Sequence, residues 1–366
     1  MPRVEVPIER LDVSVFTVPT DEPETDGTAA WDATTMVLVE ARAAGEVGLG
    51  WTYGDVASAA VVQSRLAELA VGADALRVTD VWRSLVRACR NLGRPGVASM
   101  AIAAVDSALW DLKARVLDVA LATVLDAAHA AVPIYGSGGF TSYGDERLAA
   151  QLAGWVEAGI PRVKMKVGRE PERDLARARV ARDAIGDEAE LFVDANGALS
   201  RAQALWFAER YADELAVRWF EEPVSSDDVT GLRLLCERAP GGMDIATGEY
   251  GYTLAMFERL LAADAVTCLQ ADATRCEGIT GFLRVAALCQ ARSLELSAHC
   301  SPALHAHPCC AVLPLRHLEY FHDHVRVESL LLDGVLEPVD GALHPDRSRP
   351  GNGLELKRRD ASRYAV

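Results

Sequence analysis

The stretch that decides the fold reads LFVDANG at residues 191–197, RWFEEP at 218–223 and IATGEY at 245–250. Each apolar segment closes on a carboxylate, and the three acids Asp194, Glu221 and Glu249 are 27 and 28 residues apart. One strand, one helix and two turns use about that length, so the acids are predicted to end successive parallel strands. Three converging oxygen ligands suit a hard divalent cation, Mg²⁺ or Mn²⁺ rather than zinc.

The same spacing extends in both directions from these acids. Apolar strand centres are predicted at Ile134, Val163, Phe192, Trp219, Ile245, Leu269, Leu296 and Leu318. Helical patterns fill the gaps, for example at 172–184, 201–211, 253–261 and 279–291, and little helix is expected after the eighth strand. Eight strand–helix units of this size predict an α/β fold, a closed (β/α)8 (TIM) barrel over residues 128–328.

Residues 1–127 follow a different pattern and are predicted to form an α+β capping domain. Strand-like alternation begins with LDVSVFTV at 11–18, and a hairpin is predicted around a turn at Ala44 and Gly45. The polar segment 20–32 is expected to be a surface loop or a functional lid. Helices are predicted at 61–69, 81–89 and 98–117. Residues 329–366 are rich in turn signals and are expected to pack back on the capping domain.

Composition and charge limit the partners and the compartment. The 366 residues carry a net charge of −16, from 37 basic and 53 acidic side chains, which disfavours nucleic acid and anionic membranes as partners. No signal peptide and no apolar run long enough for a transmembrane helix is visible, and the eight cysteines show no CxxC spacing. We therefore expect a cytoplasmic protein with reduced, mostly buried thiols that acts on a small molecule.

Two lysines end the second predicted barrel strand, in the sequence Val163-Lys164-Met165-Lys166. Residues i and i+2 of a strand face one way, so both ammonium groups point together, either into the barrel mouth or out to the helices. Two adjacent ammonium groups lower each other's pKa, which would let one lysine act as a neutral base. An outward pair in salt bridges is the alternative, and the three carboxylates favour the inward pair.

Polar residues also end the last three predicted strands. Asp272 ends the sixth strand and His299 ends the seventh, again 27 residues on. An aspartate beside a histidine can fix the tautomer of the imidazole and raise its basicity. His305 and His307 fall on the following helix, which leaves His299 at the mouth. Glu319 ends the eighth strand, where an inward structural acid is the alternative interpretation.

The second and seventh strands of an eight-stranded ring are three positions apart by the shorter way. Lys166 and His299 are therefore predicted to face each other across the metal, one removing a proton and the other delivering one.

As an ordered set these motifs resemble the enolase superfamily, in particular its mandelate racemase-like branch. The resemblance covers nearly the whole chain, on Lys164-Met165-Lys166, Asp194 with Asn196, Glu221-Glu222-Pro223, Gly248-Glu249, Asp272 followed by GITG at 278–281, His299, Glu319, and the helix AIAAVDSALWDLKAR. It implies Mg²⁺ held by Asp194, Glu221 and Glu249. It also implies Lys166 as one base and His299 with Asp272 as the other.

The resemblance further implies that two capping-domain loops, residues 20–32 and 51–54, close over the barrel and choose the substrate. Substrate-binding roles are accordingly predicted for Asn196, Trp51 and Tyr53, and a homo-oligomer is expected. Two residues depart from the family pattern. Arg275 stands where a Lys is usual and Glu277 where a Gly is usual, and the sequence leaves open whether the extra acid and the bulkier loop alter the pocket.

The chemistry implied is abstraction of the proton α to a carboxylate, through an enediolate that Mg²⁺ stabilises. Lys164 would add positive charge, and a protonated Glu319 would donate a hydrogen bond. Expulsion of a β-hydroxyl with His299 as general acid gives dehydration of an acid sugar to a 2-keto-3-deoxy acid, which is the favoured reaction. Return of a proton to the other face gives racemisation or epimerisation of a 2-hydroxy acid with the same residues.

Two further functions are weighed against this one. A Schiff-base aldolase would use Lys164 or Lys166 as its nucleophile and would leave the carboxylates unexplained. A non-catalytic binding barrel would be favoured if a carboxylate or lysine position were lost, and none is. Borohydride trapping would support the aldolase, whereas EDTA inactivation reversed by Mg²⁺ would count against it.

Overall fold

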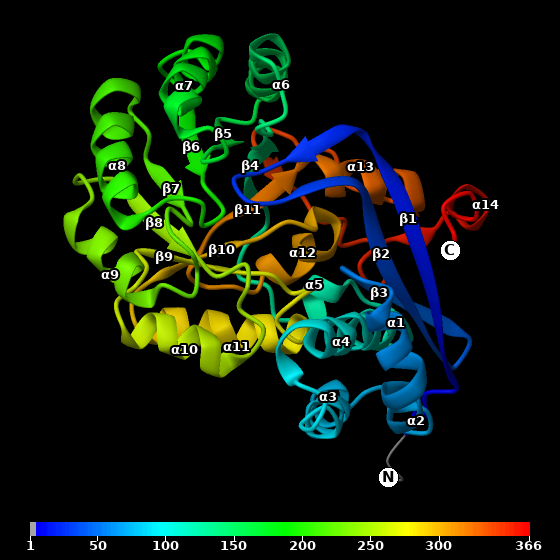
Figure 1. Cartoon of the computed structure of the whole chain (residues 1–366). Helices are drawn as coiled ribbons and strands as arrows, with labels where there is room; N and C mark the ends of the chain where they lie inside the picture. The colour runs from blue at the N-terminus through cyan, green and yellow to red at the C-terminus, as the bar shows by residue number, and fades with distance from the viewer. Residues whose placement is uncertain (1–4) are drawn as a thin grey trace.

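In the computed structural model, which describes residues 5–366, the chain begins with a three-stranded antiparallel sheet. Its strands are β1 (Arg10–Thr25), β2 (Ala30–Ala43) and β3 (Glu46–Tyr53). Ala44 and Gly45 form the predicted turn between β2 and β3, both at positive φ (53° and 82°), as the favoured two-residue hairpin turn requires. Figure 1 shows this sheet in blue beside the barrel.

Segment 20–32 is expected to be a surface loop or a functional lid. The plain loop is wrong, because most of the segment continues the β1–β2 hairpin, and the lid stays a prediction. The two strands pair as far as Thr25 and Ala30, after a register shift within β1. The chain turns at the tip, where the Asp26 carboxylate accepts a hydrogen bond from the backbone N–H of Thr28 at 2.6 Å. The acidic segment is thus an ordered arm that extends from the capping domain toward α13 (Figure 1).

Several helices follow the capping sheet along the chain. They are α1 (Ala57–Val61), η1 (Val62–Leu66), α2 (Ala67–Ala70), α3 (Val78–Ala88), η2 (Arg94–Ala98), α4 (Ser99–Val116) and α5 (Leu121–Val124). The predicted long helix is α4, which is rich in alanine and almost entirely buried. Gly48 and Gly50 of β3 lie directly against the backbone of α4, where a Cβ atom has no room.

This close approach predicts that Gly50→Ala destabilises the protein by about 2–3 kcal/mol. A Cβ atom at Gly50 would overlap the backbone of Ala104 and Ala108, which cannot move aside as a flexible side chain can. Gly154→Ala is the matched control, because Gly154 lies inside α6 (Asp145–Glu157) with open space around its Cβ position. There alanine should stabilise by roughly 0.5–1 kcal/mol. Urea unfolding measures both changes, and an unchanged midpoint for Gly50→Ala would contradict the packing.

Eight parallel strands form the barrel, and the pairing of β11 with β4 closes the ring. The predicted TIM barrel with an N-terminal cap is therefore confirmed. The strands are β4 (Val132–Gly138), β5 (Arg162–Lys166), β6 (Glu190–Asp194), β7 (Trp219–Glu221), β8 (Asp244–Thr247), β9 (Cys268–Ala271), β10 (Glu295–Ala298) and β11 (Leu315–Phe321).

A helix follows every barrel strand. After α6 come α7 (Pro171–Ile185), α8 (Arg201–Leu215), α9 (Val229–Arg238), α10 (Leu254–Ala262), α11 (Gly278–Ala291), α12 (Pro302–Cys309) and α13 (His322–Leu331). The expectation of little helix after the eighth strand is wrong, since α13 has ten residues. It begins at the residue after β11, so no turn signal separates the strand from the helix in the sequence.

Aromatic side chains fill the barrel beneath its mouth. Tyr135, Phe192 and Trp219 pack on one another and on His317, with ring centroids 4.6 to 6.3 Å apart. The indole N–H of Trp219 donates to Glu221 Oε2 at 2.9 Å. This packed layer therefore supports a carboxylate at the mouth above it.

The C-terminal segment contains β12 (Leu332–Asp333), β13 (Ala342–Leu343), β14 (Glu355–Leu356) and α14 (Arg358–Ala361). Its last residues lie along β1, where the N–H of Thr17 donates to Tyr364 O at 2.8 Å and the N–H of Val366 to Val15 O at 3.1 Å. The exact division of the chain at 127/128 and 328/329 stays a prediction.

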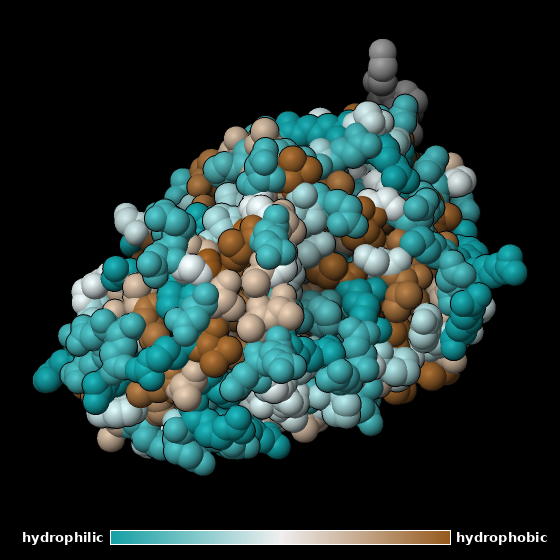
Figure 2. Space-filling model, turned by 90° about the horizontal axis from the view of Figure 1, so that it is seen from above, coloured by the Kyte–Doolittle hydropathy of each residue, from teal (hydrophilic) through white to brown (hydrophobic). Residues whose placement is uncertain are grey.

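The outer surface agrees with the charge balance of the sequence. Figure 2 shows a mostly hydrophilic face on which apolar residues are scattered among polar ones. Within residues 5–366, no helix combines the length and the apolar character needed to cross a membrane.

Candidate active site

The three acids that opened the argument meet at the C-terminal mouth of the barrel. Asp194 ends β6, Glu221 ends β7, and Glu249 lies two residues beyond β8. One oxygen atom from each lies within 4.8 Å of the others, and all three side chains are buried. Asp194 and Glu221 are direct partners in the β6–β7 register, which places their side chains next to each other.

This carboxylate cluster fits a divalent cation. Glu249 Oε2 is buried without a hydrogen-bond partner, although His299 Nε2 lies 3.4 Å away. Burial and the neighbouring charge of Asp194 raise the pKa of Glu221 to about 8. The cluster thus contains a buried oxygen without a partner and resists full ionisation. A bound cation would offset both energetic costs. The all-oxygen ligand set favours Mg²⁺.

Both lysines of β5 point into this mouth. Lys166 Nζ lies 2.5 Å from Asp194 Oδ2, and Lys164 Nζ lies 2.6 Å from Glu221 Oε1. The lowered pKa expected for the pair is not found beside the carboxylates alone, and the role of Lys166 as a base stays a prediction. Burial lowers the pKa of Lys166 and Lys164 adds to that effect, but Asp194 outweighs both and raises it. The carboxylate charge that holds the proton on Lys166 is the charge that a bound cation would offset.

His299 follows β10 and is oriented by Asp272 from the neighbouring strand β9. Its Nδ1 atom lies 2.9 Å from Asp272 Oδ2, which leaves Nε2 for a ligand. Burial lowers the pKa of His299, but Cys300, Glu249 and Glu319 raise it well above its usual value. The histidine therefore rests as a proton donor. His305, on α12, instead accepts a hydrogen bond from the N–H of Ala273 at 2.9 Å.

Glu319 could donate a hydrogen bond only if it were protonated, and its neighbours favour the ionised form. Burial alone would raise its pKa, but Lys164 and His299 hold it well below the usual range. Its Oε1 atom accepts a hydrogen bond from Ser137 Oγ at 2.5 Å and lies 2.8 Å from Lys164 Nζ. An ionised Glu319 accepts hydrogen bonds at this site and does not donate one.

A cavity of about 220 Å³ opens above these groups. Its lining consists of Asp26, Trp31, Ala33, Thr34, Lys166, Asn196, Glu249, Tyr250, Arg275, His299, Cys300, Phe321 and His324. The structure thus brings Lys166, Glu249 and His299 to one space, with Asp194 and Glu221 buried close to Glu249. Asn196 Oδ1 is buried without a partner, so it can accept a hydrogen bond from a ligand hydroxyl.

The tip of the β1–β2 hairpin forms one side of the cavity. Asp26 and Trp31 line it, and the Trp31 ring packs edge-on against Phe140 at 5.6 Å. Asp21 Oδ2, lower on the hairpin, lies 3.1 Å from His322 Nε2 of α13. These contacts hold the acidic arm against the barrel.

The second predicted specificity loop, residues 51–54, lies behind the cavity wall. Trp51 is fully buried, and its indole N–H donates to Ser301 Oγ at 3.1 Å. Tyr53 stacks on His324 with ring centroids 3.6 Å apart. Both residues support the wall through these partners, and a direct contact with substrate stays a prediction.

Of the two departures from the family pattern, Arg275 lines the cavity and Glu277 does not. Arg275 Nη1 lies 3.5 Å from Glu249 Oε1, and its guanidinium sits 5.3 Å from the Tyr250 ring centroid. Glu277 takes the left-handed backbone (φ 66°) that explains why glycine is usual there, and its carboxylate pairs with Arg94 at 3.0 Å. Glu277 therefore contributes no lining atom to the cavity.

Sequence reasoning missed several lining residues. Cys300 directly follows His299, and Phe321 and His324 lie two and five residues after Glu319. Their closeness to the ends of barrel strands could have indicated them, but the prediction used only the first polar residue at each strand end.

Glu328 of α13 holds the turn that follows His299. It accepts hydrogen bonds from Ser301 Oγ at 2.9 Å, the N–H of Ala303 at 3.0 Å and Tyr53 Oη at 3.3 Å. Burial is the main cause that raises the pKa of Glu328 from 4.5 to about 8.

This raised pKa predicts a stability change with pH. The contribution of protonated Glu328 is fully present below pH 4.5 and is lost as pH rises toward 8, because the unfolded chain ionises first. Glu328→Gln cannot titrate. As pH rises from 4.5 to 8, its free energy of unfolding should therefore fall by on the order of 2–4 kcal/mol less than that of the wild type. Chemical denaturation at several pH values tests this, and parallel curves for the two proteins would contradict it.

The fold and the site together define a class: a capped (β/α)8 barrel with a carboxylate metal site at its mouth. Residues 10–126 match the model for the "Mandelate racemase / muconate lactonizing enzyme, N-terminal domain", and residues 147–361 match "Enolase C-terminal domain-like". The chain belongs to the mandelate racemase/muconate lactonizing enzyme family of the enolase superfamily.

Three relatives show how similar the chain is to known members. A mandelate racemase/muconate lactonizing enzyme-like protein from Rubrobacter xylanophilus is 59% identical, with a TM-score of 0.96 over 98% of this chain and 99% of its own. The 3,6-anhydro-alpha-L-galactonate cycloisomerase of Streptomyces coelicolor is 31% identical over 98% of this chain and 99% of its own. The L-talarate dehydratase of Polaromonas sp. JS666, solved with Mg and L-glucarate, is 29% identical, with a TM-score of 0.88 over 99% and 98%.

Proposed function

We propose that this protein catalyses the Mg²⁺-dependent dehydration of an acid sugar to a 2-keto-3-deoxy acid. The observation that carries the proposal is the shared cavity, which Lys166, His299 and Glu249 of the carboxylate cluster all line. When bound at Asp194, Glu221 and Glu249, Mg²⁺ would supply the positive charge that makes the α-proton of a carboxylate acidic enough to remove. A relative that acts on L-talarate and was solved with Mg and L-glucarate supports both the metal and the substrate class.

Four residues of the site have defined tasks in this reaction. Lys166, in the neutral form that a cation at Asp194 would favour, takes the α-proton, so the C–H electrons pass into the enediolate of the substrate. His299, held by Asp272 through Nδ1, gives its Nε2 proton to the β-hydroxyl as the C–O bond breaks, so that water leaves. The resulting enol becomes the 2-keto-3-deoxy acid by proton transfer. Lys164, buried beside Glu221, adds fixed positive charge under the substrate carboxylate.

Two variations of this chemistry share its first step. If the β-oxygen belongs to a ring of the substrate, its departure opens the ring and no water is released, and the cycloisomerase relative favours this variation. If a proton returns to the opposite face of the α-carbon, the result is racemisation or epimerisation.

A screen of mono- and diacid sugars with Mg²⁺ in D₂O separates these outcomes by mass spectrometry. The panel includes L-talarate, L-glucarate, galactarate and 3,6-anhydro-L-galactonate. A keto acid lighter than its substrate by one water reports dehydration, a keto acid of unchanged composition reports ring opening, and α-deuterated substrate alone reports racemisation. No change in any panel member, with Mg²⁺ bound, would contradict the proposal.

A further inference from the structure

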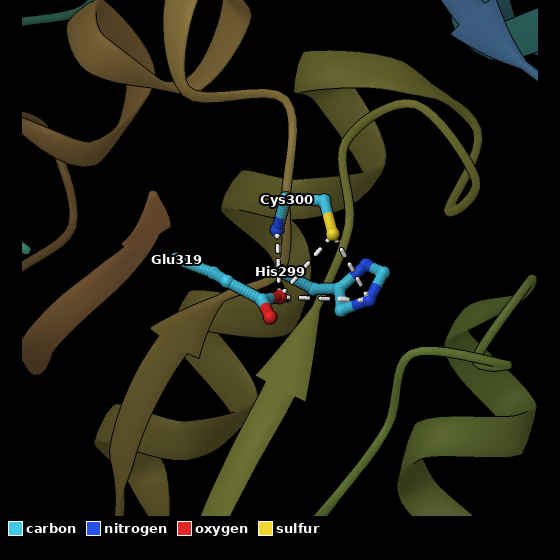
Figure 3. A group of neighbouring side chains, drawn as sticks. All are labelled: His299, Cys300 and Glu319. Carbon is cyan, nitrogen blue, oxygen red and sulfur yellow. Dashed lines mark hydrogen bonds and ion pairs between the residues drawn. The ribbon is translucent and has the colours of Figure 1, made fainter. Parts of the chain in front are cut away.

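A second group of metal-ligating side chains lies beside the carboxylate cluster. His299, Cys300 and Glu319 converge at the barrel mouth, where all three are buried (Figure 3). Cys300 Sγ lies 3.3 Å from His299 Nε2 and 3.2 Å from Glu319 Oε2, and the latter two atoms are 3.6 Å apart. This nitrogen, sulfur and oxygen set differs in kind from the all-oxygen set of Asp194, Glu221 and Glu249.

An unusual backbone conformation creates this group. Successive residues of an extended strand point to opposite sides, so neighbours such as His299 and Cys300 should not meet. Cys300 and Ser301 instead adopt left-handed φ angles of 51° and 43° directly after β10. Such angles are strained for residues other than glycine, and they persist where the surrounding structure holds them. Here Glu328 holds the turn through Ser301 Oγ at 2.9 Å and the N–H of Ala303 at 3.0 Å.

The spacing of the three ligand atoms matches a tetrahedral zinc site. Zinc binds sulfur at about 2.3 Å and nitrogen or oxygen at roughly 2.0–2.2 Å, which puts tetrahedral ligand atoms about 3.3–3.6 Å from one another. The three separations here, 3.2, 3.3 and 3.6 Å, deviate little from that range. A cation could therefore be held with small movements of the side chains.

The polar atoms of His299 and Glu319 that point away from this group have partners, and these partners orient the ligand atoms toward one another. Asp272 holds Nδ1 of His299 at 2.9 Å, the arrangement that orients histidine ligands in zinc sites. Lys164 and Ser137 hold Oε1 of Glu319, and its Oε2 atom accepts a hydrogen bond from the N–H of Cys300 at 3.2 Å, which leaves a second lone pair for a metal. Because His299 and Cys300 line the cavity, the fourth coordination position faces space that water can occupy.

We propose that His299, Cys300 and Glu319 form a second metal site, selective for Zn²⁺ and distinct from the Mg²⁺ site of the three carboxylates. The thiolate is the ligand that Zn²⁺ accepts and Mg²⁺ rejects. Binding releases the thiol proton of Cys300 and the Nε2 proton of His299 to solvent, because cysteine ligates metals as the thiolate and histidine as the neutral imidazole.

Occupation of this site engages Nε2 of His299, the atom assigned to deliver the proton. Zinc is therefore expected to inhibit turnover without displacing Mg²⁺, a consequence that rests on the proposed function. Binding of the metal itself does not rest on it and can be measured without substrate.

The test is a titration of the full-length protein with Co²⁺ and with Zn²⁺ at saturating Mg²⁺. Bound Co²⁺ that contacts a thiolate gives a sulfur-to-metal charge-transfer absorption in the near ultraviolet, and Zn²⁺ should displace it. Cys300→Ser should remove this absorption and weaken Zn²⁺ binding at least about 100-fold, since a direct ligand matters no less than its supporting partners. Cys236→Ser, at a half-buried cysteine outside the cavity, should bind like the wild type.

Thermal melting establishes that each variant is folded, and Cys300→Ala repeats the measurement if the serine variant is not. Loss of the thiolate absorption in the Cys300 variants alone supports the site. Three results would overturn it: no Co²⁺ or Zn²⁺ binding at saturating Mg²⁺, Co²⁺ binding without thiolate absorption, or absorption that survives the removal of Cys300.

Discussion

Lys166→Ala should lower turnover by about 10²–10⁴-fold, the usual contribution of a positioned general base. The Lys166 ammonium lines the cavity and contacts Asp194 Oδ2 at 2.5 Å, and alanine cannot carry a proton there. Mg²⁺ binding should persist, because the variant removes a positive charge from the carboxylate cluster and no ligand oxygen. Steady-state rates with the substrate found in the screen, and calorimetric Mg²⁺ titration, measure the two effects.

Lys357→Ala is the matched control, because Lys357 lies at the surface with its Nζ atom 2.8 Å from Ser329 O. It should keep the wild-type rate. His299→Asn is the companion change and should also remove turnover while leaving Mg²⁺ binding intact. If either Lys166→Ala or His299→Asn turned over like the wild type, the assignment of two proton-transfer groups would be wrong.

Removal of the divalent cation should abolish turnover, and Mg²⁺ should restore it fully. Asp194, Glu221 and Glu249 are buried, with one oxygen atom of each within 4.8 Å of the others. Without a cation their charges repel one another, and no metal charge makes the α-proton more acidic. Mg²⁺ at 100 times its dissociation constant should also add about 2.7 kcal/mol to the free energy of unfolding. Activity after EDTA treatment and thermal melts with increasing Mg²⁺ measure both effects.

Glu249→Gln tests the same site without a chelator. It keeps the shape of the side chain but removes the charge of the carboxylate whose Oε2 atom has no partner. Mg²⁺ affinity should fall and the Mg²⁺-dependent rise in melting temperature should shrink. Full activity after chelation would favour the Schiff-base aldolase, which needs no metal, and borohydride trapping of Lys164 or Lys166 would then support it.

The barrel could be predicted because its repeat is regular. One apolar strand and one helix recur about every 27 residues, and the acids at 194, 221 and 249 mark the same end of three strands. The acidic hairpin could not be predicted in the same way. Its proline and glycine residues interrupt the alternation of β1, and pairing across the bulge depends on contacts with the barrel that the sequence does not display.

The members of the candidate site could be predicted more readily than their charge states. Lys164 and Lys166 do face the mouth together, but whether a lysine loses its proton depends on distances to every neighbouring charge. Asp194 at 2.5 Å from Lys166, and Lys164 at 2.8 Å from Glu319, decide the direction of each pKa shift. Cys300 escaped prediction for a different reason, since only its left-handed backbone turns the thiol toward His299.

The central claim is that Lys166 removes the α-proton under control of the metal site. Its most direct test is solvent exchange at the α-carbon. The substrate is incubated with Mg²⁺ in D₂O and followed by proton NMR, with wild-type protein, Lys166→Ala and His299→Asn. His299→Asn should exchange the α-hydrogen for deuterium without releasing water, and Lys166→Ala should do neither. Exchange at the wild-type rate in Lys166→Ala, or a substrate that loses its α-hydrogen by neither exchange nor turnover with wild-type protein, would contradict the account.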